Sequence, residues 1–243
     1  MEYPADGGVP HPVFEAEVPT EAQEGGEAVF QRIKASIKAA LEANPDVEVL
    51  GVGIGAAGVV DPKTGAIAYA NEIMPGWSGV QLGPRLREDL GLPVAVVGDV
   101  QAHALGEAHW GVGKGKFSVL CLGIGTGIGG AYVENGRVMQ ASMVLPAYGP
   151  HRVLGCAGIP CACGRSGHLE SVASGTSIGR MYDERFGRVD PSRPSVGRDV
   201  NDLCRAGDAK ATEVIHDAGL RWAPAWARSL TSWTLRSSCF RAA

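Results

Sequence analysis

Asp99 is the acidic residue whose place in the sequence most strongly suggests chemistry. It follows the short apolar run Val94–Val97 and precedes Gln101–Trp110, which has the pattern of a helix. In α/β folds, ligands and catalytic carboxylates gather at the carboxyl ends of buried strands. A carboxylate at such a place can accept the proton of a substrate hydroxyl as a general base. The alternative is that Asp99 only caps the helix that follows.

A glycine-rich stretch follows the apolar run Val119–Leu122, and we predict a loop over Gly125–Gly130. Closely spaced glycines allow backbone N–H groups to approach an anion, and the hydroxyl of Thr126 can add a donor. The stretch is not a Walker loop, because no Gly-Lys-Ser/Thr follows it. A tight β-hairpin that binds no ligand is the alternative.

Cysteine and histidine gather in a third stretch, where Cys161 and Cys163 precede His168 by a few residues. With His151 they supply four soft ligands of the kind that hold structural zinc, and Cys156 is a rival for the fourth position. Such a site would hold a loop that a small local core could not. A set of free thiols is the alternative.

The elements that must position these residues alternate between strands and helices, which indicates an α/β fold. An amphipathic helix is predicted over Glu27–Ala43, with apolar residues at helical spacing. Further helices and strands are predicted from the same kind of pattern: strands at Val47–Ile54, Ala66–Ala70, Val94–Val97, Ser118–Gly123 and Ala131–Val133, and helices at Val80–Leu90, Gln101–Trp110 and from Glu170 onward. A turn is expected at Asn135-Gly136. We expect two lobes, residues 1–113 and 114–243.

Composition excludes several classes of protein. The net charge of −4 gives no basic footprint for nucleic acid or for an anionic membrane, so neither is an expected partner. No apolar run reaches the roughly 18 residues that span a bilayer. Residues 1–12 lack the basic-then-apolar order of a signal peptide. We therefore expect a cytoplasmic protein, in which clustered cysteines favour metal over disulfides.

Five motifs in a fixed order resemble the Repressor/ORF/Kinase (ROK) family, which contains ATP-dependent hexose and N-acyl-hexosamine kinases and sugar-responsive repressors. The matching segments are Val52–Asp61, Pro75–Val80, Gly98–Glu107, Gly125–Gly130 and Cys161–Glu170. The resemblance implies a two-lobed fold of the actin-like ATPase (ribonuclease-H-like) type. It implies phosphorylation of a hexose such as glucose, and it is compatible with a homodimer.

The resemblance also implies roles for residues on the sugar side. Asp99 matches the catalytic base that activates the sugar hydroxyl. Glu170 matches a glutamate that hydrogen-bonds the sugar, and His151 matches a histidine that both binds zinc and lies beside the sugar. Gly58 and Trp77 match the rim of the sugar site.

The remaining implied roles concern ATP and metals. The glycine stretch matches the second phosphate loop of the family, so the expected contacts to ATP are Gly125, Thr126, Gly127 and Gly129. Mg2+ would bridge the phosphates. The expected ligands of structural Zn2+ are His151, Cys161, Cys163 and His168.

The chain departs from the family pattern at several positions. It has no opening strand with an Asp-x-Gly-Gly-Thr loop, and Gly98 stands where the family has an asparagine. Tyr148 replaces a glutamate, and His168 replaces a third zinc cysteine. The family's last glycine-rich segment, beside the adenosine, is also missing. Together these departures predict a chain truncated at both ends, with kinase activity weakened or lost. The alternatives are a non-catalytic sugar-binding regulator of the repressor type and an inactive gene remnant.

Overall fold

The computed structural model describes residues 8–70, 74–139, 154–161 and 165–230, with the backbone alone for 154–157 and 222–230. The chain forms two compact units, and the boundary between them in the sequence falls between Gly115 and Lys116. The sequence patterns had placed this boundary after residue 113. We refer to Met1–Gly115 as the N-terminal unit and to Lys116–Ala243 as the C-terminal unit.

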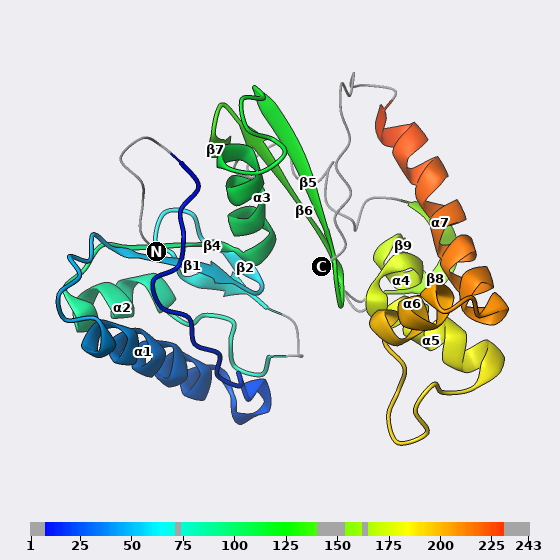
Figure 1. The fold of residues 1–243 in the computed structure, drawn as a ribbon, viewed down its shortest axis with the longest axis horizontal. Helices are drawn as coiled ribbons and strands as arrows, with labels where there is room; N and C mark the ends of the chain where they lie inside the picture. Colours follow the sequence, from blue (N-terminus) through cyan, green and yellow to red (C-terminus); the bar gives the residue numbers. More distant parts are fainter. Residues whose placement is uncertain (1–7, 71–73, 140–153, 162–164, 231–243) are drawn as a thin grey trace. The chain divides into compact units, whose positions relative to one another are not determined.

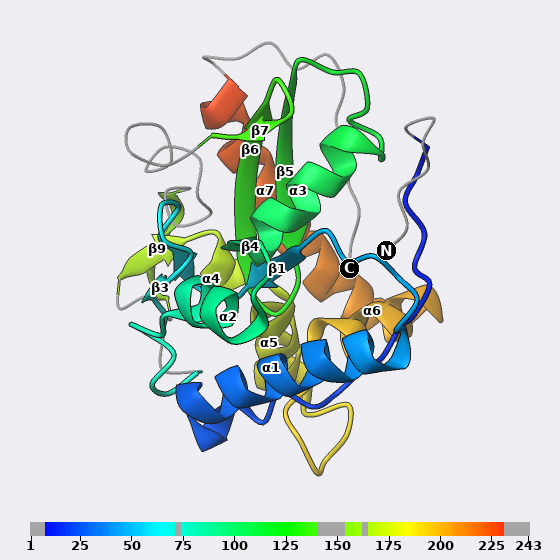
Figure 2. The ribbon, with the colours of Figure 1, turned by 90° about the vertical axis from the view of Figure 1, so that its left-hand side faces the viewer.

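The N-terminal unit has a parallel pair of strands at its centre. Its elements are η1 (Ala22–Glu24), α1 (Gly26–Ala43), β1 (Val52–Ala56), β2 (Val59–Val60), β3 (Ile67–Tyr69), α2 (Leu82–Leu90), β4 (Val94–Gly98) and α3 (Asp99–His109). Strands β1 and β4 pair in parallel, while β2 and β3 form a separate antiparallel pair. Helices α1 and α2 lie on one side of the β1–β4 pair and α3 lies on the other (Figures 1 and 2).

The core of this unit lies between the strands and the two helices α1 and α2. Helix α1 buries Val29 and Phe30, as its helical spacing predicts. The guanidinium of Arg85 on α2 lies 3.7 Å from the centre of the Phe30 ring. The same guanidinium forms two hydrogen bonds of 2.7 and 2.8 Å with the Glu27 carboxylate, so a surface ion pair joins α1 to α2 above the core.

The C-terminal unit joins an antiparallel sheet to a helical cluster. Its elements are β5 (Ser118–Ile124), β6 (Ile128–Glu134), β7 (Arg137–Val138), β8 (Leu154–Pro160), β9 (Ser166–His168), α4 (Glu170–Ala173), α5 (Gly175–Phe186), α6 (Gly197–Arg205) and α7 (Ala209–Leu230). Strands β5, β6 and β7 form one antiparallel sheet, and β8 pairs with β9. Positive φ angles at Asn135 and Gly136 confirm the turn predicted between β6 and β7.

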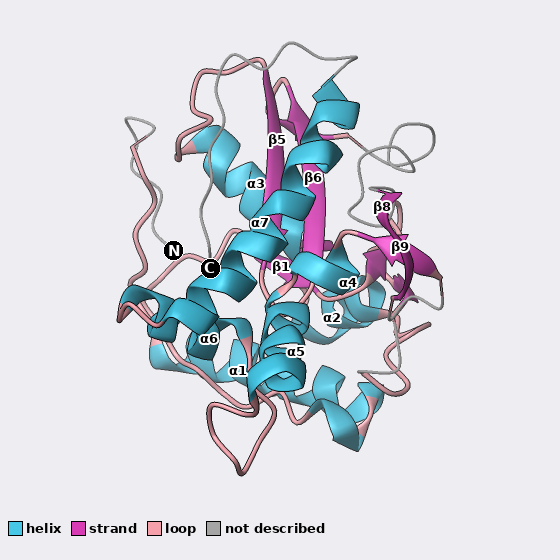
Figure 3. Ribbon diagram, turned by 90° about the vertical axis from the view of Figure 1, so that its right-hand side faces the viewer, coloured by secondary structure: helices cyan, strands magenta, loops and turns pink. Residues whose placement is uncertain are grey.

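Helices α4 to α7 pack around one apolar core (Figure 3). Its most buried members are Val200 of α6 and Ala211 and Val214 of α7, each with no exposed surface. Ile128 belongs to the same core, so the start of β6 is held against the helices. Within the described residues, no helix combines the length and the apolar character needed to cross a membrane.

Two predicted boundaries are wrong. Strand β1 begins at Val52 and not at Val47, because the backbone at Val47 still bonds to the Asn44 turn and its side chain is 49% exposed. The predicted loop over Gly125–Gly130 is shorter, since β6 already begins at Ile128. Backbone pairing between Gly123 and Gly129 extends the sheet into this glycine stretch.

Candidate functional site

Two predicted site residues lie at the same edge of the N-terminal sheet. In the parallel β1–β4 pair, Ala56 is the register partner of Gly98. The residues that come next, Ala57-Gly58 after β1 and Asp99 after β4, therefore leave the sheet side by side. This is the edge at which parallel α/β sheets place ligand-binding groups.

Asp99 is the first residue of α3, and its side chain is exposed. Gly98 holds the N-cap position, and its N–H donates to the Gln101 side chain at 2.9 Å. Asp99 Oδ1 accepts the N–H of Val100 at 2.8 Å. The positive end of α3 favours a carboxylate at this place. Asp99 thus stabilises the helix start and still presents its carboxylate to solvent.

Two glycines allow this edge to form. A Cβ on Gly55 would lie 3.1 Å from the Cβ of Ala102, so the small residue lets α3 approach β1 closely. Gly58 has φ of 94°, in the left-handed region, and a Cβ there would lie 2.5 Å from the carbonyl oxygen of Tyr69. Neither position has room for a larger side chain.

Trp77 lies under the Gly58 turn and not at its surface. The side chain is 2% exposed and belongs to the core of the N-terminal unit. Its indole N–H donates to the carbonyl oxygen of Ala57 at 3.1 Å. The structure therefore gives Trp77 a packing and anchoring contact, and direct contact with a sugar stays a prediction.

The glycine stretch forms a tight hairpin loop in the C-terminal unit. Ile124 pairs with Ile128, which leaves Gly125, Thr126 and Gly127 as the loop. The N–H of Gly125 donates to the carbonyl of Gly127 at 2.9 Å. Among the described residues, the N–H groups of Thr126 and Gly127 donate to no protein acceptor. The hairpin alternative is thus confirmed as a geometry, and two N–H groups remain at the tip to meet an anion.

Two helix starts lie against this loop. The N–H of Gly175, at the start of α5, donates to the carbonyl of Gly125 at 2.8 Å. A Cβ on Gly197, at the start of α6, would lie 2.6 Å from the Cα of Gly175. The backbone of the loop therefore contacts the start of α5, which in turn contacts the start of α6. The positive ends of both helices lie near the loop.

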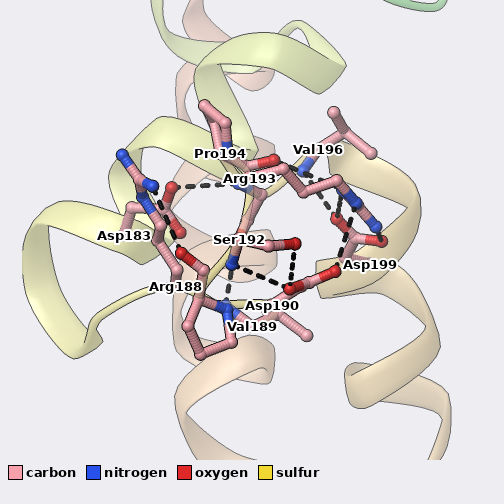
Figure 4. A network of polar contacts seen from close by, with 11 residues as sticks. Asp183, Arg188, Val189, Asp190, Ser192, Arg193, Pro194, Val196 and Asp199 are labelled. Carbon is pink, nitrogen blue, oxygen red and sulfur yellow. Dashed lines mark hydrogen bonds and ion pairs between the residues drawn. The ribbon is translucent and has the colours of Figure 1, made fainter.

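The segment between α5 and α6 is fixed by its own polar contacts (Figure 4). Arg193 pairs with Asp199 through two hydrogen bonds of 2.8 and 2.9 Å, and Asp183 accepts the N–H of Ser195 at 3.0 Å. The Arg193 guanidinium and the N–H of Val196 lower the pKa of Asp199 to about 2, so this carboxylate is charged at neutral pH. These contacts hold the start of α6 in place beneath the loop.

Glu170 contacts both the glycine loop and the cysteine-rich hairpin. Its Oε2 accepts the N–H of Ile128 at 2.9 Å, and its Oε1 accepts the thiol of Cys161 at 3.6 Å. Resemblance alone had pointed to a sugar contact for this residue. The bond to Ile128 joins residues 42 positions apart, which no sequence pattern reveals.

The structure describes two of the four predicted zinc ligands. Cys161 and His168 are buried, at 8% and 5% exposure, and both belong to the β8–β9 hairpin region. His151 and Cys163 lie outside the described residues, and the side chain of Cys156 is also not described. Within the described part of the chain, no three His, Cys, Asp or Glu side chains are grouped to hold a metal ion. The four-ligand site stays a prediction.

Sequence reasoning missed three residues that support these sites. The side chain of Gln101 accepts the N–H of Gly98, the residue before Asp99. Ser174 caps α5, and Ser177 Oγ donates to the Glu170 carbonyl at 2.8 Å. A serine before a helix is a recognised N-cap signal, so Ser174 could have been found. The other two contacts depend on backbone geometry.

Comparison with known proteins gives the family. The sequence model of the ROK family matches residues 13–236. A glucokinase from Halalkalibacterium halodurans is 33% identical over 205 residues, which is 83% of this chain and 62% of that protein. The chain thus spans less than two thirds of the length of this curated relative.

Solved structures agree with this match. The ROK hexokinase from Thermus thermophilus aligns with a TM-score of 0.69 and 31% identity, over 89% of this chain and 69% of that one. A ROK glucokinase from Streptomyces griseus, in complex with glucose and AMPPNP, aligns with a TM-score of 0.68 and 27% identity, over 84% of this chain and 69% of that one. The predicted α/β fold of the actin-like ATPase type is confirmed. The chain belongs to the ROK family.

Proposed function

We propose that this chain carries the site of an ATP-dependent sugar kinase, acting on a hexose such as glucose. The observation that carries the proposal is the exposed Asp99 carboxylate at the carboxyl end of β4, next to the Gly58 turn that ends β1. That pairing places a candidate base beside the backbone turn that ends β1. The similarity to a glucokinase that binds glucose and AMPPNP supports the same reaction class.

Asp99 is the proposed catalytic residue. It accepts the proton of the sugar hydroxyl as that oxygen attacks the terminal phosphorus of ATP. Its place at the first residue of α3 leaves the carboxylate exposed at the strand end, where a substrate hydroxyl can reach it. Gly58 and Trp77 shape the sugar side, with Glu170 and His151 as further sugar contacts.

The glycine loop is the proposed phosphate site. The tip N–H groups of Thr126 and Gly127 suit an anion, and a Cβ on Gly125 would lie more than 4 Å from every atom of the described residues. Gly129 lies in β6, where it pairs with Gly123 and helps to close the hairpin. When bound, ATP with Mg2+ supplies the transferable phosphoryl group and neutralises its charge.

Structural Zn2+ is a further part of the proposal. Cys161 and His168 suit such a role by chemistry, because both are buried soft ligands; Cys161 follows β8 directly and His168 is the last residue of β9. Cys163 and His151 complete the proposed set. Metal analysis of the purified protein should find one zinc per chain, and a chain free of zinc at a pH where the histidines are neutral contradicts this assignment.

We further infer a cytoplasmic location, where ATP is available and thiols stay reduced. A homodimer is the proposed assembly, which a mass measurement in solution tests directly. A monomer at micromolar concentration contradicts it.

A coupled assay of ADP release tests the kinase. Glucose, mannose and N-acetylmannosamine are offered in turn, with the mass of the sugar phosphate verified. We expect any ADP release to require both ATP and sugar, and its rate to be weakened by the departures from the family pattern. Sugar binding without any turnover favours a non-catalytic regulator, and the loss of both activities favours an inactive remnant.

A further inference from the structure

Both carboxylate oxygens of Glu170 are engaged inside the C-terminal unit. Oε2 accepts the N–H of Ile128 at 2.9 Å, at the point where the glycine loop ends and β6 begins. Oε1 accepts the Cys161 thiol at 3.6 Å. One half-buried side chain therefore joins the glycine loop to the hairpin that carries Cys161.

The glycine loop is shaped to fit this carboxylate. A Cβ on Gly127 would lie 2.7 Å from Glu170 Oε2, so a side chain at Gly127 and the carboxylate cannot share the space. Gly127 does not have a positive φ, so backbone conformation alone does not require glycine here. The close approach of the Glu170 carboxylate instead explains why this position is a glycine.

The backbone of Glu170 is itself held firmly. Ser177 Oγ donates to the Glu170 carbonyl at 2.8 Å, and Ser177 N–H donates to Ser174 Oγ at 3.2 Å. On the other side of the loop, the N–H of Gly175 donates to the Gly125 carbonyl at 2.8 Å. An anchor whose own backbone is fixed can fix the loop that it contacts.

We propose that Glu170 is a positioning residue for the glycine loop, through its bond to the Ile128 N–H. By fixing the end of the loop, it sets the direction of the N–H groups of Thr126 and Gly127. A hydrogen bond to a charged acceptor is shorter and stronger than one between neutral groups. This inference rests on the proposed function only for the ligand of the loop, and it adds a second role to the sugar contact implied for Glu170.

Hydrogen exchange of the ligand-free chain tests the contact without any activity. We expect Glu170→Ala to raise exchange across residues 123–130 by about tenfold, since a charge-assisted bond is lost. Glu170→Gln keeps an acceptor oxygen and should stay closer to the wild type. Glu184→Ala removes an exposed carboxylate on α5 in the same unit and should leave the loop unchanged. Unchanged exchange in Glu170→Ala overturns the proposal.

A double substitution guards against a Glu170→Ala chain that fails to fold. Gly127→Ala alone should raise loop exchange, because its Cβ displaces the carboxylate. Once Glu170 is alanine, or shortened to aspartate if alanine does not fold, the same change should add less than about twofold, since the clash is relieved. Strictly additive effects overturn the contact.

Binding of Mg–AMPPNP without sugar gives the functional measurement. We expect an affinity about tenfold weaker for Glu170→Ala than for Glu170→Gln, because only the alanine variant loses the acceptor. Normal nucleotide affinity with weakened sugar affinity shows that Glu170 acts at the sugar alone and overturns the proposal. A wild-type chain that binds no nucleotide refutes the proposed function, and the exchange experiment still decides the role of Glu170.

Discussion

The N-terminal unit assembles its candidate site from the ends of adjacent strands, whereas the C-terminal unit assembles its own from contacts between distant segments. Asp99 and Gly58 lie at the same sheet edge because Gly98 and Ala56 are register partners in one parallel pair. The glycine loop instead depends on Glu170 and Gly175, which lie over 40 residues later in the chain. Sheet register thus defines one site, and helix packing defines the other.

This difference predicts where damage will spread. A change to the core beneath the Gly58 turn should affect only the N-terminal unit. A change between α5 and the segment before α6 should affect only the C-terminal unit and its glycine loop. Substitutions in each unit, with readouts for both, test the comparison.

Replacing Trp77 with alanine should give the largest effect. We expect the free energy of unfolding of the N-terminal unit to fall by about 3–5 kcal/mol, because a fully buried aromatic side chain leaves a cavity. The bond from the indole to Ala57 is lost as well. Urea denaturation followed by circular dichroism measures the change, and hydrogen exchange assigns it to a unit.

Trp110→Ala is the matched control, since Trp110 is only partly buried at the end of α3. It should cost much less than Trp77→Ala. If both variants lose equal free energy of unfolding, burial of Trp77 is not the cause. If Trp77→Ala raises hydrogen exchange in the C-terminal unit as much as in the N-terminal unit, the separation of the two units is contradicted.

Replacing Asp99 with asparagine should act mainly on turnover, with only a small effect on stability from the lost charge at the start of α3. We expect turnover to fall by about 10²-fold or more, as loss of a general base does, with nucleotide affinity nearly unchanged. The side chain is exposed, so unfolding should change little. Asp89→Asn removes a surface carboxylate paired with Lys34 in the same unit and serves as the control. Near-normal turnover in Asp99→Asn shows that another residue is the base.

The strand end that carries Asp99 could be predicted from the sequence, whereas the burial of Trp77 in the core could not. Short apolar runs mark β4 and most of β1, and Asp99 directly follows a run, so strand periodicity locates it. The wrong start of β1 has a physical cause, since Val47 and Leu50 are apolar yet exposed after the Pro45 turn. Hydrophobicity alone does not distinguish such residues from buried ones.

The C-terminal site could be predicted only in part. Glycine spacing located the loop, but its length was overestimated because glycines also occupy paired positions in β6. The contact between Glu170 and Ile128 depends on how α4 packs against the sheet. Tertiary contacts of this kind leave no periodic signal in the sequence.

Replacing Gly179 with alanine should give an intermediate effect in the C-terminal unit. A Cβ on this residue of α5 would collide with the carbonyl oxygen of Ser195, and a backbone atom has little freedom to move. We expect a loss of about 1–3 kcal/mol in the free energy of unfolding, as overpacking typically costs. The glycine loop should also exchange faster, because α5 supports it.

Gly219→Ala is a demanding control for that prediction. Gly219 lies in α7, and among the described residues a Cβ there would meet nothing within 4 Å. The same substitution should therefore stabilise the unit by up to about 1 kcal/mol, through helix propensity. If both variants are destabilised equally, close packing of α5 is not the cause.

The smallest expected effects concern two surface carboxylates, one in each unit, and they depend on pH. Hydrogen bonds from Arg85 and then Gln31 lower the pKa of Glu27 from 4.5 to about 2, and Arg193 and the Val196 N–H lower that of Asp199 from 3.8 to about 2. A carboxylate with a lower pKa in the folded state stabilises the fold above its unfolded pKa. That contribution is lost as the pH falls from about 4.5 for Glu27, or 3.8 for Asp199, through 2.

We expect Asp199→Asn to cost more than Glu27→Gln at pH 6, because Asp199 is 14% exposed and Glu27 is 64% exposed, so solvent screens the Glu27 pair more strongly. Both differences from the wild type should shrink toward pH 2 in denaturation experiments, and a difference that stays constant from pH 6 to pH 2 contradicts the ionic origin.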